Sequence, residues 1–247
     1  NLGSAWGSSN YHGLQVSANR RVGKGLQFGV AYTFSKVLGA TSANPYFDFK
    51  YWNYGPQAMD RSQVLVFNYI YDLPKLGERL GSKPARWVLD NWKLSGITSF
   101  ISGSPYTPTF TTTDGADLTG SEITGRIVVT GDPRLSKSEK TFYRTFKTEL
   151  FARPAKGDWG NAGVGILRGP GVNNWDLALS KQIPLGSEER NLIFRGEFFN
   201  AWNHTQFSSV DSTARFDPTG KQTNSLFGSY NASRAPRIIQ FSLKLSF

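Results

Sequence analysis

The last twelve residues, Pro236 to Phe247, alternate between apolar and polar side chains. Every second residue from Ile239 to the end of the chain is apolar. The residues between them, Gln240, Ser242, Lys244 and Ser246, are polar. Because successive side chains on a β-strand point to opposite faces, this pattern predicts a strand with one apolar and one polar face. A strand that crosses a membrane needs about 9–11 residues. Strands of soluble sheets can alternate in the same way, but the length and the final aromatic residue favour an outer-membrane strand.

The composition favours an all-β protein. Aromatic residues make up 14% of the chain, there are 26 Gly residues, and the chain has no cysteine. No window approaches the roughly 18 consecutive apolar residues of a membrane helix. The absence of cysteine excludes disulfides, thiol catalysis and cysteine metal sites. The net charge of +10 comes from scattered Lys and Arg residues, without a dense basic run, so we expect no nucleic-acid binding.

Six further segments alternate like the last one: 11–20, 26–35, 63–73, 90–103, 175–183 and 191–200. The first two flank a short Gly-containing turn and predict a β-hairpin. Together the seven segments predict an antiparallel transmembrane β-barrel. The region 104–174 also holds two weaker candidates, 106–113 and 122–129, and a segment, 143–150, that fits a short helix or a strand.

The lengths of the connections alternate along the chain. Short turns at 21–25, 74–85 and 184–190 are interleaved with long connections at 37–61, 104–174 and 201–234. Bacterial barrels have short periplasmic turns and long extracellular loops. The region 104–174 is therefore expected to be a long extracellular loop within the barrel.

The number of strands is odd, which places the first strand's start outside the cell if Phe247 ends in the periplasm. Bacterial barrels close on themselves with an even number of strands. We therefore expect residues 1–247 to be the C-terminal portion of a larger barrel. The chain shows no signal peptide and no initial Met, which agrees with a processed chain or a piece of a longer one.

Four charged residues fall on the polar face of their strands and are candidates for the barrel lumen: Lys93, Arg195, Glu197 and Lys244. A Lys or Arg that faces lipid at mid-bilayer would cost about 2–4 kcal/mol. Lys181 breaks the pattern, and we expect its long stem to reach the headgroups from a strand end. Arg195 and Glu197 fit either a substrate path or ion pairs with neighbouring strands, and the second is favoured.

Several aromatic residues fit either an aromatic girdle at the membrane interface or a ligand-contacting surface loop. They are Tyr46, Tyr51, Trp52, Tyr54, Trp92 and Trp175.

Candidates for catalysis or metal binding are few, and we expect no enzyme activity and no cofactor. The two histidines, His12 and His204, stand in no catalytic or metal-binding motif, and His204 is expected to pack in a loop. Four carboxylates in long loops could bind a cation, but we favour the interpretation that they are solvated. They are Asp114, Asp117, Glu122 and Asp132.

Nine segments, taken in order, resemble the C-terminal barrel half of TonB-dependent outer-membrane receptors. The Oar-like group, which has a carboxypeptidase-regulatory-like N-terminal domain, is the most similar. The segments are 11–15 (YHGLQ), 32–36 (YTFSK), 92–97 (WKLSGI), 102–108 (SGSPYTP), 160–163 (GNAG), 167–171 (LRGPG), 175–181 (WDLALSK), 194–204 (FRGEFFNAWNH) and 236–241 (PRIIQF).

This resemblance implies a 22-stranded barrel of the bacterial outer membrane, filled by an N-terminal plug that is missing from this sequence. It implies energy from the TonB complex acting through the plug, an unknown substrate, and contact with outer-membrane lipid. It also implies that the barrel-assembly machinery reads the terminal aromatic residue, within an assembly signal formed by Phe241, Leu243, Leu245 and Phe247. Two alternatives remain open: a passive pore or surface adhesin barrel, and a soluble β-rich carbohydrate-binding module.

Overall fold

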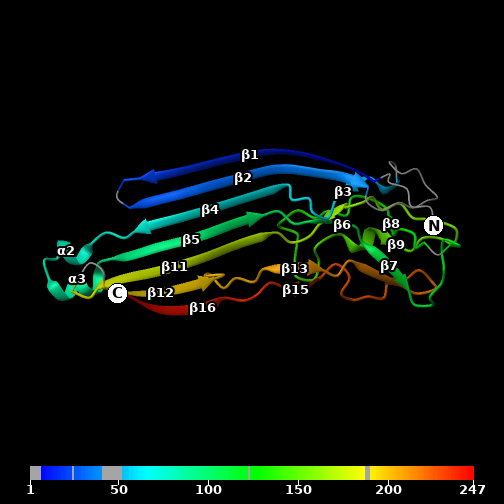
Figure 1. Ribbon diagram of the computed structural model, residues 1–247. Coiled ribbons are helices and arrows are strands. Elements are labelled where there is room, and N and C mark those ends of the chain that lie inside the picture. Colours follow the sequence, from blue (N-terminus) through cyan, green and yellow to red (C-terminus); the bar gives the residue numbers. More distant parts are fainter. Residues whose placement is uncertain (1–6, 24, 41–51, 122, 187–189) are drawn as a thin grey trace.

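The computed structural model describes residues 7–23, 25–40, 52–121, 123–186 and 190–247. Seven long strands form one antiparallel sheet in chain order (Figure 1), which confirms the expected all-β antiparallel fold. A two-residue strand, β3 (Gly55–Pro56), pairs with the end of β2. The seven are β1 (Ser8–Val22), β2 (Leu26–Ala40), β4 (Gln63–Asp72), β5 (Trp92–Ile101), β11 (Val172–Pro184), β12 (Asn191–Phe199) and β16 (Ile238–Ser246).

The first hairpin is longer than the alternation predicts. β1 pairs with β2 over its whole length, from Ser8 opposite Ala40 to Val22 opposite Leu26. The extension includes polar residues such as Asn10, which interrupt the apolar pattern. Hydrogen bonding between strand backbones does not need an apolar face, so the pairing continues through them. The expected turn over 74–85 is also different, since it contains two short helices, α2 (Leu76–Arg79) and α3 (Lys83–Leu89). None of the helices in the described ranges is long and apolar enough to cross a membrane.

The sheet has two faces of opposite character. Antiparallel partners share a face, so the strand register assigns each side chain to one of them. The apolar face carries Leu14, Val16, Phe28, Val30, Tyr32, Leu65, Phe67, Tyr69, Tyr71, Leu94, Leu177, Leu179, Phe194, Phe198, Ile239, Phe241, Leu243 and Leu245. The polar face carries Asn19, Arg21, Gln27, Asn68, Asp72, Lys93, Ser95, Asp176, Arg195, Glu197, Gln240 and Lys244.

Much of the apolar face is left uncovered by the described residues. Phe241 is 65% exposed and Leu243 is 66% exposed, although neither carries a polar group. A large exposed apolar surface indicates contact with a membrane or a partner. A strand of ten residues such as β5 is about 33 Å long, and a tilt of about 40° reduces its height to about 25 Å, the height of a barrel's apolar band.

The long connections lie at one end of the sheet and the short ones at the other (Figure 1). Segments 102–171 and 200–237 fold together, and we call them the cap. The cap contains four two-stranded sheets: β6 (Pro105–Tyr106) with β10 (Leu167–Arg168), β7 (Thr109–Thr112) with β14 (Thr213–Phe216), β8 (Val128–Val129) with β9 (Phe151–Ala152), and β13 (Phe207–Val210) with β15 (Tyr230–Ser233). The β7–β14 pair is parallel and joins the two segments.

A separate hydrophobic core holds the cap together. Phe146 is fully buried, and its ring meets those of Phe151 and Phe227 edge-to-face at centroid distances of 5.4 and 5.1 Å. Edge-to-face pairs of this kind contribute about 0.5–1.5 kcal/mol each beyond the burial of area. The buried cluster comprises Phe110, Leu118, Ile127, Phe146, Phe151, Ala162, Leu167, Ala214, Phe216 and Phe227.

The region 104–174 therefore folds as part of the cap, and within its described residues no strand of 104–171 joins the large sheet. The candidate strand at 106–113 is split into β6 and β7, and the one at 122–129 is reduced to β8, with Glu122 outside the described residues. The segment 143–150 ends in one turn of 3₁₀ helix, η1 (Thr148–Leu150).

Candidate functional site

The polar face is hollowed into a concavity of about 690 Å³. Its lining residues come from β1, β2, β4, β5, β11 and β12, so residues far apart in the chain meet there. Its lining includes the polar residues Asn19, Arg21, Gln27, Asn68, Ser95, Asp176, Arg195 and Glu197 and the apolar residues Ile70, Ile97 and Phe199. Water-exposed amide, hydroxyl and charged groups of both signs make this surface suited to a hydrated, polar ligand or a polar protein surface.

Two ion pairs lie on the polar face. Lys93 Nζ is 3.3 Å from a carboxylate oxygen of Asp72, and Arg195 donates to Glu197 at 2.8 Å. The second pair lies within one strand, so the expected pairing of Arg195 and Glu197 with neighbouring strands is wrong. Lys93 and Asp72 are each about half exposed, and such surface pairs contribute only about 0–1 kcal/mol. These charges are placed where water solvates them, and they do not hold the sheet together.

The structure places the proposed assembly segment at one edge of the sheet. Phe241 stacks on Phe194 at 5.9 Å and meets Phe198 edge-to-face at 6.4 Å, both on the apolar face. Lys244 lies on the opposite, polar face and forms no ion pair within the described part of the chain. Phe247 is 94% exposed.

Lys181 lies on the apolar face but does not extend away from the protein. Its ammonium donates to the carbonyl oxygens of Val88 at 3.1 Å and Asp90 at 2.7 Å, and it lies 5.0 Å from the centre of the Trp92 ring. The side chain is only 7% exposed. The expectation that Lys181 reaches outward to headgroups is therefore wrong, because the C-terminal carbonyls of α3 satisfy its charge.

The aromatic candidates lie in three places. Trp92 and Trp175 are at opposite ends of the apolar face, and Trp175 contacts Trp202 edge-to-face at 6.1 Å. Trp52 instead lies under the Arg126 guanidinium, 4.3 Å from it, within the cap end of the molecule. Tyr54 accepts a hydrogen bond from Asn10 at 3.1 Å, whereas Tyr46 and Tyr51 lie outside the described residues.

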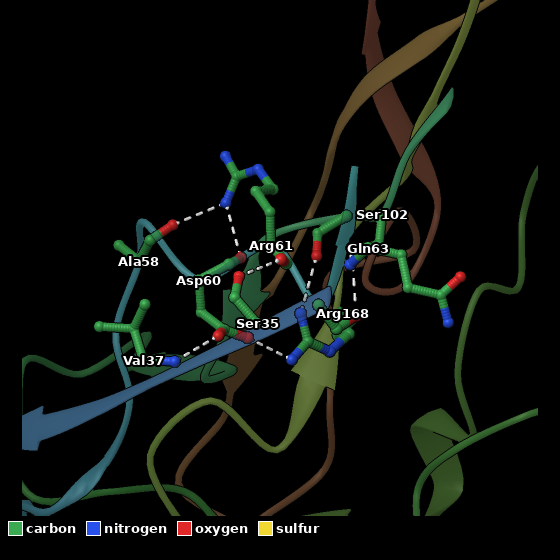
Figure 2. A network of polar contacts seen from close by, with 10 residues as sticks. Ser35, Val37, Ala58, Asp60, Arg61, Gln63, Ser102 and Arg168 are labelled. Carbon is green, nitrogen blue, oxygen red and sulfur yellow. Dashed lines mark hydrogen bonds and ion pairs between the residues drawn. The ribbon is translucent and has the colours of Figure 1, made fainter. Parts of the chain in front are cut away.

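A network of polar contacts joins the cap to the strands, as Figure 2 shows. At its centre the Asp60 carboxylate is fully buried, accepts the backbone N–H of Val37 at 2.6 Å and forms an ion pair with Arg168. Arg168 also donates to the carbonyl of Gly103 at 3.1 Å. The pair therefore connects the loop before β4, the end of β2 and both ends of the first cap segment.

Hydroxyl groups extend this network to β4 and β5. Ser35 donates to the carbonyl of Arg61 at 3.0 Å, and Ser102 accepts the backbone N–H of Gln63 at 3.0 Å (Figure 2). The network fixes the cap over the ends of the strands. Reasoning from the sequence missed Asp60, because its partner Arg168 lies 108 positions away and no local pattern connects the two.

The loop carboxylates are engaged in local structure. Asp117 accepts bonds from the Thr119 backbone at 2.9 Å, and Asp132 pairs with Arg134 at 2.8 Å. The hydrogen bond from the Arg134 side chain holds the pKa of Asp132 below its ordinary value. No cluster of three potential metal ligands occurs among the described residues, from which Glu122 is excluded.

The other candidates are also dispersed. Asp114 lies 3.5 Å from Arg153 in the cap. His12 is exposed on β1, and His204 is partly buried in the cap, where its carbonyl accepts a bond from Asn200 at 3.2 Å.

Comparison with known proteins agrees with the two-faced sheet. A family model described as an outer membrane beta barrel domain matches residues 1–240. No curated protein and no solved structure matches the chain. The apolar face, the polar concave face and the long connections gathered at one end are the features that such a domain requires. The chain therefore belongs to the outer membrane β-barrel domain family, whose members reside in the bacterial outer membrane.

Proposed function

We propose that these seven strands are the C-terminal arc of a larger, plugged transport barrel of the TonB-dependent type. The observation that carries the proposal is the open sheet: β1 pairs only with β2, and β16 only with β12, among the described residues. Since every pairing between them is antiparallel, β1 and β16 run in the same direction.

Joining β1 to β16 would create a parallel seam, whereas bacterial single-chain barrels are antiparallel with an even number of strands. An odd number of further strands between these two edges removes the conflict. A barrel of about 22 strands would need about fifteen more, which is odd. The resemblance of the nine sequence segments to TonB-dependent receptors supports this size, and a plug upstream would connect the barrel to the TonB complex.

The polar face then becomes the lumen wall, and its concavity of about 690 Å³ would contact the plug or a passing substrate. The cap becomes an extracellular structure that meets the substrate first. A shallow cleft on the cap offers polar contacts for it, from hydroxyl and amide groups such as those of Thr111 and Asn224 and from the charged side chains of Asp211 and Arg215. We propose no catalytic step, because the chain's role would be binding and passage.

Single-cysteine labelling in the full parent protein tests the orientation of the sheet, and residues 1–247 contain no cysteine of their own. Ser95→Cys and Leu94→Cys are neighbours on β5 that face opposite sides. In outer-membrane fragments that are open to the label from both sides, a small membrane-impermeant maleimide should label S95C more than L94C. The reverse pattern would overturn the lumen assignment.

Planar-bilayer conductance separates the transport proposal from its alternative, a passive pore. The full parent protein, with everything encoded upstream, should carry almost no steady current because a plug fills the lumen. Steady ohmic conductance would refute the plugged receptor and favour the pore. A soluble carbohydrate-binding module does not agree with the family or with the uncovered apolar face.

A further inference from the structure

The turn between β4 and β5 is a packed helical unit. α2 and α3 lie at the end of the sheet opposite the cap (Figure 1). Gly77 lies directly against the backbone of α3, where a Cβ atom would come within 2.4 Å of the Arg86 Cα. The Gly77 N–H donates to the Asp90 carboxylate at 2.7 Å, in a buried contact. These contacts fix the two helices to one another, and we call residues 75–90 the helical turn.

The helical turn is attached to the apolar face of the sheet. Trp92 donates its indole N–H to the carbonyl of Val88 at 2.9 Å, and the Lys181 ammonium donates to the same carbonyl at 3.1 Å. Trp92 and Lys181 are opposite one another in the register, in a row with Phe194 and Leu243 on the apolar face. The C-terminus of α3 therefore lies at the border of the apolar face that is farthest from the cap.

The outer surface of the helical turn continues that apolar surface. Leu80 is 67% exposed and Trp87 is 65% exposed, and Leu76 and Val88 are about half exposed. Apolar side chains on a short helical element beside a lipid-facing wall are suited to the boundary between headgroups and acyl chains. Trp favours this boundary in particular.

Positive charge surrounds these apolar side chains. Arg79, Lys83 and Arg86 make no ion pair among the residues that the structure describes. Of the two acids within residues 75–90, Glu78 is 3.9 Å from Lys75, and Asp90 is buried and bound to the Gly77 N–H. A cleft of about 380 Å³ opens between the helical turn and the end of β11, and Lys83, Arg86 and Trp87 are among its lining residues.

We infer that the helical turn binds anionic phospholipid headgroups of the periplasmic leaflet. Lys83 and Arg86 donate to the phosphate oxygens, Trp87 lies at the headgroup level, and the acyl chains follow the apolar face beside β11. Charge complementarity and continuity with the lipid-facing wall both select this ligand. The inference rests on membership of the outer-membrane family and on the proposed extracellular position of the cap, but not on whether the barrel transports a substrate.

Native mass spectrometry of the full chain, extracted in detergent with added phosphatidylglycerol, tests this directly. Lys83→Gln together with Arg86→Gln should weaken phosphatidylglycerol binding about 30-fold, from about fivefold for each basic residue near an anionic headgroup. The control, Lys137→Gln with Lys140→Gln, makes the same charge change at exposed positions in the cap and should leave binding unchanged. Equal loss in both variants, or in neither, would overturn the inference.

A fluorescent probe at Leu80→Cys provides a measurement that does not depend on the basic residues. In nanodiscs with phosphatidylglycerol, its emission should shift to shorter wavelength relative to nanodiscs of neutral lipid, and K83Q/R86Q should remove the shift. An emission maximum typical of water in both lipids would show that the helical turn lies away from the membrane, and would refute the inference. If inorganic phosphate removed the shift in the same way as the double variant, the ligand would be a soluble anion and the lipid assignment would be wrong.

Discussion

Removal of Arg168 should destabilise the attachment of the cap more than removal of its partner Asp60. Asp60 is fully buried, whereas the Arg168 side chain is 37% exposed. Arg168→Met would leave a buried carboxylate whose one remaining donor among the described residues is the Val37 N–H, which costs about 3–5 kcal/mol. Asp60→Asn would leave Arg168 in contact with water and with the Gly103 carbonyl, and should cost about 1–2 kcal/mol.

Hydrogen exchange of the folded protein in detergent measures these costs, because the Val37 N–H donates directly to Asp60. At about 1.4 kcal/mol per factor of ten, R168M should accelerate exchange of the peptide containing Val37 by roughly 150- to 4,000-fold. D60N should accelerate it by about 5- to 30-fold. The Asp132–Arg134 pair is exposed on both sides, so the control Arg134→Met should change exchange less than threefold, that is by less than about 0.6 kcal/mol.

The double variant D60N/R168M gives the strictest test. If the cost of R168M is a stranded buried charge, adding D60N removes that charge and should restore part of the lost protection. The reasoning would be refuted if the double variant exchanged faster than R168M alone, or if D60N exchanged faster than R168M.

Three further predictions follow from the cap and the last strand. Phe146→Ala, in the centre of the cap core, should cost about 3–5 kcal/mol and make the cap sensitive to limited proteolysis, while the strands keep their circular dichroism signal. Burial raises the pKa of Tyr106 above its ordinary value of 10.0, so the stability gained from the neutral phenol is complete below pH 10 and is lost as the pH rises through the folded-state value. Phenolate absorbance with proteolysis should therefore show the cap opening at strongly alkaline pH, and Tyr106→Phe should reduce that sensitivity. Phe247→Ser in the full-length parent should lower the amount assembled in the outer membrane, and normal surface levels would remove Phe247 from the assembly signal.

The large sheet could be predicted from the sequence because its signal is local. Each strand alternates over about ten residues, and a pattern such as that of 236–247 is visible without knowing its neighbour. The same pattern assigned Lys93 and Glu197 to the polar face, where the register places them. Pairing of each strand with the next in the chain then follows from the short and long connections.

The cap could not be predicted because its contacts join segments far apart in the sequence. β7 and β14 are four residues each and pair across about a hundred positions, as Thr109 with Thr213. Strands this short carry too few alternating residues to give a pattern. The helical turn does carry a local signal: Ser82 stands at the N-cap of α3, and Pro84 lies in its first turn, where Pro is typical of a helix start.

The positions of the buried residues explain why cap and sheet need different surroundings. Of the twelve buried apolar residues described, ten belong to the cap core, and the other two are Ala40 and Ala178 in the sheet. The sheet therefore has almost no protein core, and its Leu, Ile and Phe side chains gain their burial only from lipid at about 25 cal/mol per Å². The cap instead has its own core, which it would need if it projects beyond the membrane into water, as in the proposed arrangement. The sheet and the cap therefore need a stable connection, and the ion pair of Asp60 and Arg168 lies where the two meet.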